Sequence, residues 1–211
     1  MSRSEKQRRT KKQRRNGNIK KIFVLVFLIA IIIFVRVITD AYLDNKAMEY
    51  IKSGEVPGWI QQQFLNEDRK SRPQYALDEI NGIVVHYVAN PGSSAEANRN
   101  YFNKPDTSVS SHFIVGLDGE IIQCIPLYEQ SVASNKRNAD TISIEVCHLD
   151  AGGKFNRTTM NSLIKLTSWL VDTCRLDKDD VIRHYDITGK LCPKYYVEHE
   201  DAWEKFKSQL D

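Results

Sequence analysis

The chain has 211 residues, of which 41% are hydrophobic and 27% charged. This composition suits one globular domain with extra segments, and the domain is large enough to form a hydrophobic core without disulfides or structural metal ions. The net charge of +3 conceals two unlike parts, because residues 1–21 carry a net charge of +9 and the remainder carries −6. A basic tail on an acidic body argues against nucleic acid as the partner of the folded part.

An apolar segment follows the basic tail. Residues 22–38, IFVLVFLIAIIIFVRVI, contain one charged residue, Arg36, and just reach the ~17–25 residues that a helix needs to cross a bilayer. Arg36 lies near the outer end, from which a long side chain can reach the interface. We therefore expect one transmembrane anchor at 22–38.

The charge before this segment predicts its orientation. An excess of Lys and Arg favours a cytoplasmic tail at 1–21, attracted to anionic lipid, and a C-terminal domain outside the cell membrane. A cleaved signal peptide is the alternative. Its basic region would be unusually long, and VITDAY is a poor cleavage site.

Residues 39–80 are expected to connect the anchor to the domain. DAYLDNKAMEYIKSG, at 40–54, is typical of a helix of mixed charge that ends at Gly54. The following stretch carries turn-forming residues and Trp59, and we expect its later part to pack on the domain. The domain itself is expected to span 81–211.

The domain interleaves β-rich and helical patterns. Residues 82–88, GIVVHYV, have apolar residues on both faces, as is typical of a central strand. The other expected elements are a helix at 94–102, a hairpin at 112–125 around Asp118-Gly119, a strand at 141–147, a helix at 158–176, a short strand at 181–183 and a helix at 197–210. This order predicts a mixed α/β layer fold.

Three of these elements carry a defined inward face. In TISIEVC, the strand at 141–147, three apolar residues alternate with Ser143 and Glu145, which point the other way. The inward residues are expected to be Ile142, Ile144 and Val146 in the strand, Leu163, Leu166, Leu170, Val171 and Cys174 in the helix at 158–176, and Trp203, Phe206 and Leu210 in the terminal helix.

The chain has four cysteines, a number that is compatible with either a reducing or an oxidising compartment. Cys124 and Cys147 both fall in expected strands. They can form a disulfide only if those strands lie side by side, and the sequence leaves this open.

The stretch RHYDITGKLCP places His184 and Cys192 at the two ends of one tight loop. One interpretation is a surface turn with a chance cysteine. The other is a pair of zinc ligands, because neutral imidazole and thiolate suit zinc, and a catalytic zinc site has three protein ligands. His86, at the end of the first strand, is the candidate for the third ligand, although such a residue is usually a buried structural histidine.

Four collinear motifs extend this pattern: GIVVHYVANPGSS, VSSHFIVGLDGEIIQCIP, DTISIEVC and IRHYDITGKLCPKYY. Together they resemble the zinc-dependent N-acetylmuramoyl-L-alanine amidases, a superfamily that includes phage amidase-type lysozymes and animal peptidoglycan recognition proteins. The resemblance implies an α/β fold with a mixed central β-sheet flanked by helices. It also implies zinc ligands at two histidines and a Cys or Asp, which carry over to His86, His184 and Cys192.

The reaction implied by the resemblance is hydrolysis of the amide between N-acetylmuramic acid and L-alanine in peptidoglycan. Zinc can activate water and polarise the carbonyl, and a carboxylate should accept the proton of the water. Glu145 matches the family's catalytic glutamate, and Lys190 matches a family lysine that steadies the oxyanion. The alternative for Glu145 is a solvent-facing strand residue, and the alternative for Lys190 is an ordinary surface lysine.

Further substrate contacts are also implied. His112 matches a family histidine that lines the cleft, with a plain strand histidine as the alternative. Ser111 is also expected to bind substrate. It stands where many relatives carry a tyrosine, so a mechanism that relies on that phenol is in doubt. SVASNKRN, at 131–138, replaces a Trp-His pair of many relatives, and we expect Asn135 and Arg137 to contact a muropeptide carboxylate.

Two other functions stay open: a non-catalytic peptidoglycan-binding module, and a zinc hydrolase of another amide, since a fold does not determine a substrate. Cys192 favours the enzyme, because members of the superfamily that bind without cleaving lack this cysteine. We expect the catalytic domain to face the cell wall from the outer side of the membrane. His148 and His199 match no motif and are expected at the surface.

Overall fold

The computed structural model describes residues 2–210, except for the side chains of Lys6 and residues 9–19. The chain divides into two compact units, Met1–Lys46 and Ala47–Asp211.

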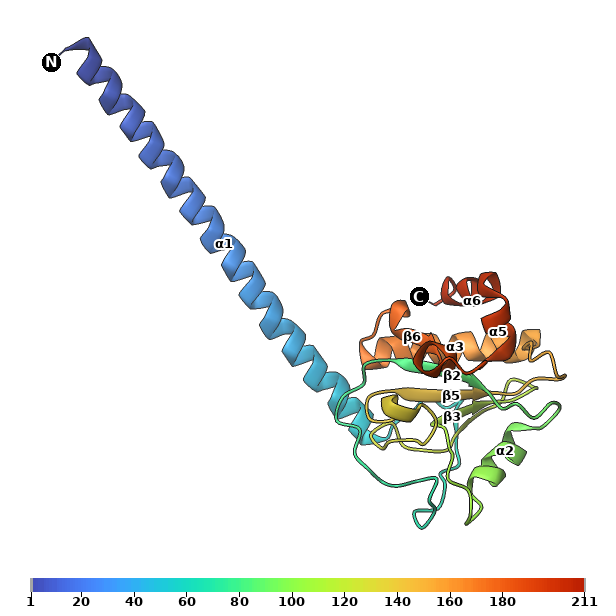
Figure 1. Cartoon of the computed structure of the whole chain (residues 1–211). Helices are drawn as coiled ribbons and strands as arrows, with labels where there is room; N and C mark the ends of the chain where they lie inside the picture. Colours follow the sequence, from blue (N-terminus) through green and yellow to red (C-terminus); the bar gives the residue numbers. More distant parts are fainter. Residues whose placement is uncertain (1, 211) are drawn as a thin grey trace. The chain divides into compact units, whose positions relative to one another are not determined.

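The first unit consists of most of helix α1, Arg3–Ser53, whose last residues belong to the second unit (Figure 1). The part Lys20–Ser53 of α1 contains a window of mean hydropathy 3.1 and is, by length and composition, able to cross a membrane. Phe27 and Phe34 are 66% and 65% exposed. An anchor and a signal sequence share these properties.

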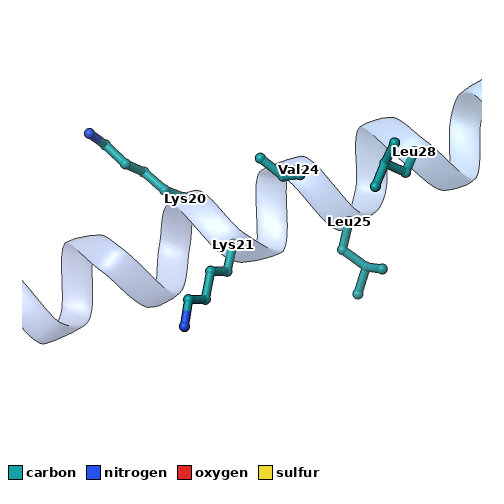
Figure 2. Close-up of a pocket in the computed structure, with 5 residues that line it drawn as sticks. All are labelled: Lys20, Lys21, Val24, Leu25 and Leu28. Carbon is teal, nitrogen blue, oxygen red and sulfur yellow. The ribbon is translucent and has the colours of Figure 1, made fainter.

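The basic tail passes directly into the apolar part of α1. Figure 2 shows the side chains at this junction, where Lys20 and Lys21 precede Val24, Leu25 and Leu28 along the helix. The two ammonium groups extend away from the apolar side chains. This arrangement is typical of a helix that enters a bilayer beside a charged interface.

The second unit is built on a six-stranded sheet with the order β1-β4-β3-β5-β2-β6. Its strands are β1 Gln61–Gln62, β2 Ile83–Tyr87, β3 Phe113–Val115, β4 Ile121–Gln123, β5 Ile142–Val146 and β6 Val181–Arg183. The neighbours β3 and β4 are antiparallel, as the expected hairpin requires, and all other neighbours are parallel. The mixed α/β fold is thus confirmed.

Helices cover both faces of this sheet. Figure 1 shows α3, α5 and α6 on one side and α2 on the other. The helical elements are α2 Ala95–Phe102, α3 Arg157–Cys174, α4 His184–Thr188, α5 Lys194–Glu198 and α6 Glu200–Lys207, with 3-10 turns η1 Asn135–Arg137 and η2 Lys178–Asp180.

Each face of the sheet has its own apolar core. Alternate residues of β2, β3 and β5 pack against the apolar stripe of α3, together with Trp203, Phe206 and Leu210. The intervening residue Ile114 packs against Phe102 of α2 in a second core. Helix α2 packs on β3 and β4. It therefore does not cover the same face of the sheet at β2 and β5. Alternation places His86 and Glu145 on that face.

The expected connecting segment 39–80 joins the domain from Ala47 onward. Ile51 and Ile60 are 2% and 6% exposed in the larger core, and Leu65 lies in the second core. Strand β1 adds to the sheet edge beside β4. The later part of this segment therefore packs on the domain as expected, and the compact unit begins well before the expected domain start.

Shortening Ile51 should destabilise the domain, although this residue belongs to the same helix as the apolar segment. Ile51→Ala is expected to lower the free energy of unfolding by ~2–5 kcal/mol, because it leaves a cavity in the core. Denaturant unfolding of the full chain in detergent, followed by tryptophan fluorescence, measures the change. Lys52→Ala, at the exposed next residue, is the control; equal stability of the two variants would contradict the packing.

The expected terminal helix at 197–210 is wrong in one respect, because the structure has two helices, α5 and α6, separated at His199. In a continuous helix the Tyr196 carbonyl would accept from the amide of Glu200. Here that carbonyl accepts from Arg183 Nη1 at 2.9 Å, and the same guanidinium pairs with the Glu200 side chain. The buried arginine thus takes the acceptor that the helix would need.

All four cysteines are free. Cys124 follows β4 and Cys147 follows β5, and β3 lies between these two strands. The disulfide that the sequence left open is therefore not formed.

Candidate active site

Three ligand-type side chains meet at the carboxyl ends of β2 and β6. His86 lies near the end of β2, His184 directly follows β6, and Cys192 lies eight residues further on. All three are buried, and their ligand atoms lie within 4.8 Å of one another. The structure therefore brings together the three residues that the sequence singled out.

A single helical turn returns Cys192 to His184. Helix α4 begins at His184 and ends at Gly189, whose φ of 75° lies in the left-handed region that glycine adopts without steric cost. The Gly189 amide donates to the Tyr185 carbonyl at 2.8 Å, and the Tyr185 amide donates to the Cys192 carbonyl at 2.9 Å. These two bonds close the loop.

The two imidazoles present the same nitrogen to the cluster. His86 Nδ1 lies 3.8 Å from Cys192 Sγ. His184 Nδ1 is buried and has no hydrogen-bond partner among residues 2–210. Both Nε2 atoms face away from the cluster, that of His86 lying 3.3 Å from Ser134 Oγ and that of His184 lying 3.0 Å from Asn135 Oδ1. The cluster is thus formed by two Nδ1 atoms and one sulfur.

The electrostatics of the cluster suit a bound cation. Burial, with the charge of Lys190 adding to it, lowers the pKa of both His86 and His184, so both rings are neutral. Burial, with Glu145 adding to it, raises the pKa of the Cys192 thiol to about 12. A divalent cation would replace the thiol proton and satisfy the partnerless His184 Nδ1. The residues therefore fit a metal ion of the zinc type.

Glu145 lies beside this cluster on β5. Its backbone pairs in register with His86 on β2. Its Oε2 atom is shielded from solvent and lacks a hydrogen-bond partner within the described part of the chain. Burial raises the pKa of this carboxyl to about 8, and the charge of Lys190 opposes the rise. A carboxyl that changes protonation near neutral pH is suited to proton transfer.

Lys190 is exposed, but its charge reaches the whole cluster. Its positive charge acts to lower the pKa of four groups: His86, His184, Glu145 and Cys192. At Glu145 and Cys192 this effect opposes the larger rise that burial causes. The lysine therefore lies where an ammonium group can act on a substrate held at the cluster.

His112 and Ser111, the two residues expected at the substrate cleft, are enclosed within the domain. Both are fully buried. His112 Nδ1 accepts from the Ser143 amide at 3.0 Å, and Nε2 faces the Glu129 carbonyl at 2.8 Å. Burial lowers the pKa of His112 to about 4, which keeps the ring neutral. Ser111 Oγ donates to the Phe113 carbonyl at 2.8 Å. Both side chains thus hold the sheet together.

The side chains of Arg137 and Asn135 point to different parts of the domain. The Arg137 guanidinium pairs with Asp140 at 2.8 Å and donates to the Asn81 carbonyl at 3.2 Å, at the start of β2. The cluster lies at the other end of this strand. Asn135 reaches the cluster, but its amide oxygen faces His184. The structure therefore gives Arg137 a structural role, and it does not bring this residue to the cluster.

Of the two histidines that match no motif, one differs from expectation. His148 is 1% exposed, with Nδ1 2.7 Å from the Asp150 carbonyl and its ring stacked on Tyr87 at 5.1 Å between centroids. Its expected surface location is wrong, whereas His199 is exposed as expected. Ser134, which contacts His86, was not expected at the site, because a serine in a polar loop carries no specific signal.

Comparison with known proteins gives the family. The family model described as Amidase_2, N-acetylmuramoyl-L-alanine amidase, matches residues 76–195. The chain belongs to the N-acetylmuramoyl-L-alanine amidase family. The expected family is thus confirmed.

Two relatives in Bacillus subtilis (strain 168) are named N-acetylmuramoyl-L-alanine amidases. BlyA is 32% identical over 168 residues, covering 70% of this chain and 45% of the relative. XlyA is 33% identical over 161 residues, covering 72% of this chain and 50% of the relative. The chain therefore spans about half the length of these relatives.

A solved structure of the catalytic domain of XlyA matches with a TM-score of 0.63 at 32% identity. The match covers 72% of this chain and 99% of that domain. The amidase domain seen here is thus similar to an entire catalytic domain of the family.

Proposed function

We propose that the domain hydrolyses the amide between N-acetylmuramic acid and L-alanine in peptidoglycan, with a zinc ion held by His86, His184 and Cys192. The observation that carries this proposal is the convergence of three buried ligand atoms within 4.8 Å in a member of the amidase family. The relatives named as amidases of this type support the substrate.

The donor set supports zinc as the metal. Two neutral imidazoles and one thiolate are ligands that zinc prefers, and three protein ligands are the number typical of catalytic zinc sites. When bound, zinc would activate a water molecule and polarise the scissile carbonyl.

Two side chains of the site would complete the reaction. Glu145 accepts the proton of the attacking water and passes it to the leaving amine, for which a pKa of about 8 is suitable. Lys190 places a positive charge near the carbonyl oxygen and stabilises the negative charge that develops there. Its exposure leaves the ammonium group accessible to substrate.

The location follows from α1 and the substrate together. We infer that the apolar part of α1 anchors the chain in the cell membrane with its basic tail in the cytoplasm. The amidase domain then lies outside, where peptidoglycan lies. The length and hydropathy of Lys20–Ser53 support the anchor.

The activity is tested by incubating the full chain, purified in detergent, with peptidoglycan. We expect free L-alanine amino groups to be released in the presence of zinc, and release to stop when a chelator removes the metal. Wall binding without release would favour a binding module. Cleavage of another amide alone would favour a different hydrolase.

A further inference from the structure

We propose that Ser134 and Asn135, two consecutive residues of one turn, are positioning residues that orient both imidazoles of the metal site. This inference rests on the zinc site proposed above and adds the outer partners of its two histidines. It replaces the expectation that Asn135 serves to contact substrate.

The contact at His184 determines which nitrogen carries the proton. Asn135 Oδ1 lies 3.0 Å from His184 Nε2 and can only accept a hydrogen bond, so Nε2 must donate. A neutral ring with its proton on Nε2 presents an unprotonated lone pair on Nδ1. That Nδ1 is the buried atom without a partner in the part of the chain that the structure describes. The amide of Asn135 therefore directs a free lone pair into the cluster.

The contact at His86 uses the same ring nitrogen, and its partner is a hydroxyl, which can donate as well as accept. Ser134 Oγ lies 3.3 Å from His86 Nε2, on the side of the ring opposite to Cys192 Sγ. Ser134 is 1% exposed, so this contact is shielded from bulk solvent. Both rings thus use Nε2 for the turn and Nδ1 for the cluster.

The turn is built to hold these two side chains. The amides of Ala133 and Ser134 both donate to Asn138 Oδ1, at 3.1 and 2.6 Å, and the Asn138 amide donates to the Asn135 carbonyl at 3.1 Å. Asn135 has a φ of 53°, in the left-handed region that asparagine tolerates better than most residues. Arg137 pairs with Asp140 and donates to the Asn81 carbonyl just before β2, which fixes the far end of the turn.

Outer partners of this kind determine the tautomer and the ring orientation of metal-bound histidines, and their loss typically costs ~10–100-fold in metal affinity. The test is zinc affinity of the full chain in detergent, measured by competition with a chromophoric chelator. Asn135→Gly keeps the left-handed backbone but removes the amide, and we expect it to weaken zinc binding ~10–100-fold. Ser134→Ala should weaken binding in the same direction.

Two variants separate this role from a structural one. Asn135→Asp keeps an acceptor for Nε2 and should retain the wild-type affinity or exceed it. Lys136→Ala changes the exposed next residue of the same turn and should leave the affinity unchanged. Wild-type affinity in Asn135→Gly would overturn the proposal.

The tautomer gives a second readout that needs no metal. Long-range proton–nitrogen NMR correlations of the histidine rings in the zinc-free chain should show His184 protonated on Nε2. In Asn135→Gly we expect a mixture of the two tautomers. A proton on Nδ1 of His184 in the wild-type chain would overturn the inference. If the wild-type chain bound no zinc, the proposed function would fail, and the tautomer would still decide the role of the turn.

Discussion

Replacing Glu145 with glutamine will remove most turnover on peptidoglycan while the chain keeps its zinc. The amide of glutamine has nearly the same shape as the carboxyl but cannot accept the proton of water. Loss of a general base typically costs ~10²–10⁴-fold in rate. Because Glu145 is not one of the three clustered ligand residues, metal content should stay the same. Turnover and zinc per chain, measured on the same preparation, check both parts.

Glu204→Gln is the matched control, since it removes the same charge from an exposed residue of α6. This variant should turn over like the wild type. Normal turnover in Glu145→Gln would show that another group accepts the proton. Zinc loss in that variant would show that Glu145 acts through the metal centre.

Replacing either Cys192 or His86 with alanine will prevent the chain from retaining zinc. Each substitution removes one of three ligand atoms, so the loss of affinity should exceed the ~10–100-fold typical of an outer partner. Activity should disappear with the metal. Elemental analysis after dialysis and chelator competition measure the retained zinc.

The cysteines offer an internal control for this experiment. Cys174→Ala removes a partly buried thiol from α3, which packs on the opposite face of the sheet from the cluster, and should keep zinc. Cys192→Asp supplies the alternative ligand that the family resemblance implies, and it should retain part of the zinc affinity. Full zinc retention in Cys192→Ala would contradict the ligand set.

The cluster was predictable because strand ends and residue chemistry coincide. His86 lies near the end of β2 and His184 directly follows β6, and the carboxyl ends of these parallel neighbours meet at one edge of the sheet. The spacing from His184 to Cys192 allows one turn ended by a glycine. Four collinear motifs then pointed to the same three residues. These features are local in the sequence, so they can be recognised without knowledge of the tertiary contacts.

The roles of His112 and Arg137 were not predictable in the same way. Alternation gives the face on which a side chain lies, but not what covers it. His112 is enclosed by backbone groups of Ser143 and Glu129, which are distant in the sequence. Arg137 is held by Asp140 and Asn81. Such long-range contacts decide between a substrate contact and a structural one.

The arrangement of the sulfurs has a consequence for the redox chemistry of the domain. Cys124 and Cys147 are kept apart by an intervening strand, and Cys174 packs in the core on the opposite face of the sheet. Burial raises the pKa of these three thiols to about 12, so their reactive thiolate form is scarce. These three thiols are therefore neither paired with one another nor readily oxidised in the folded domain.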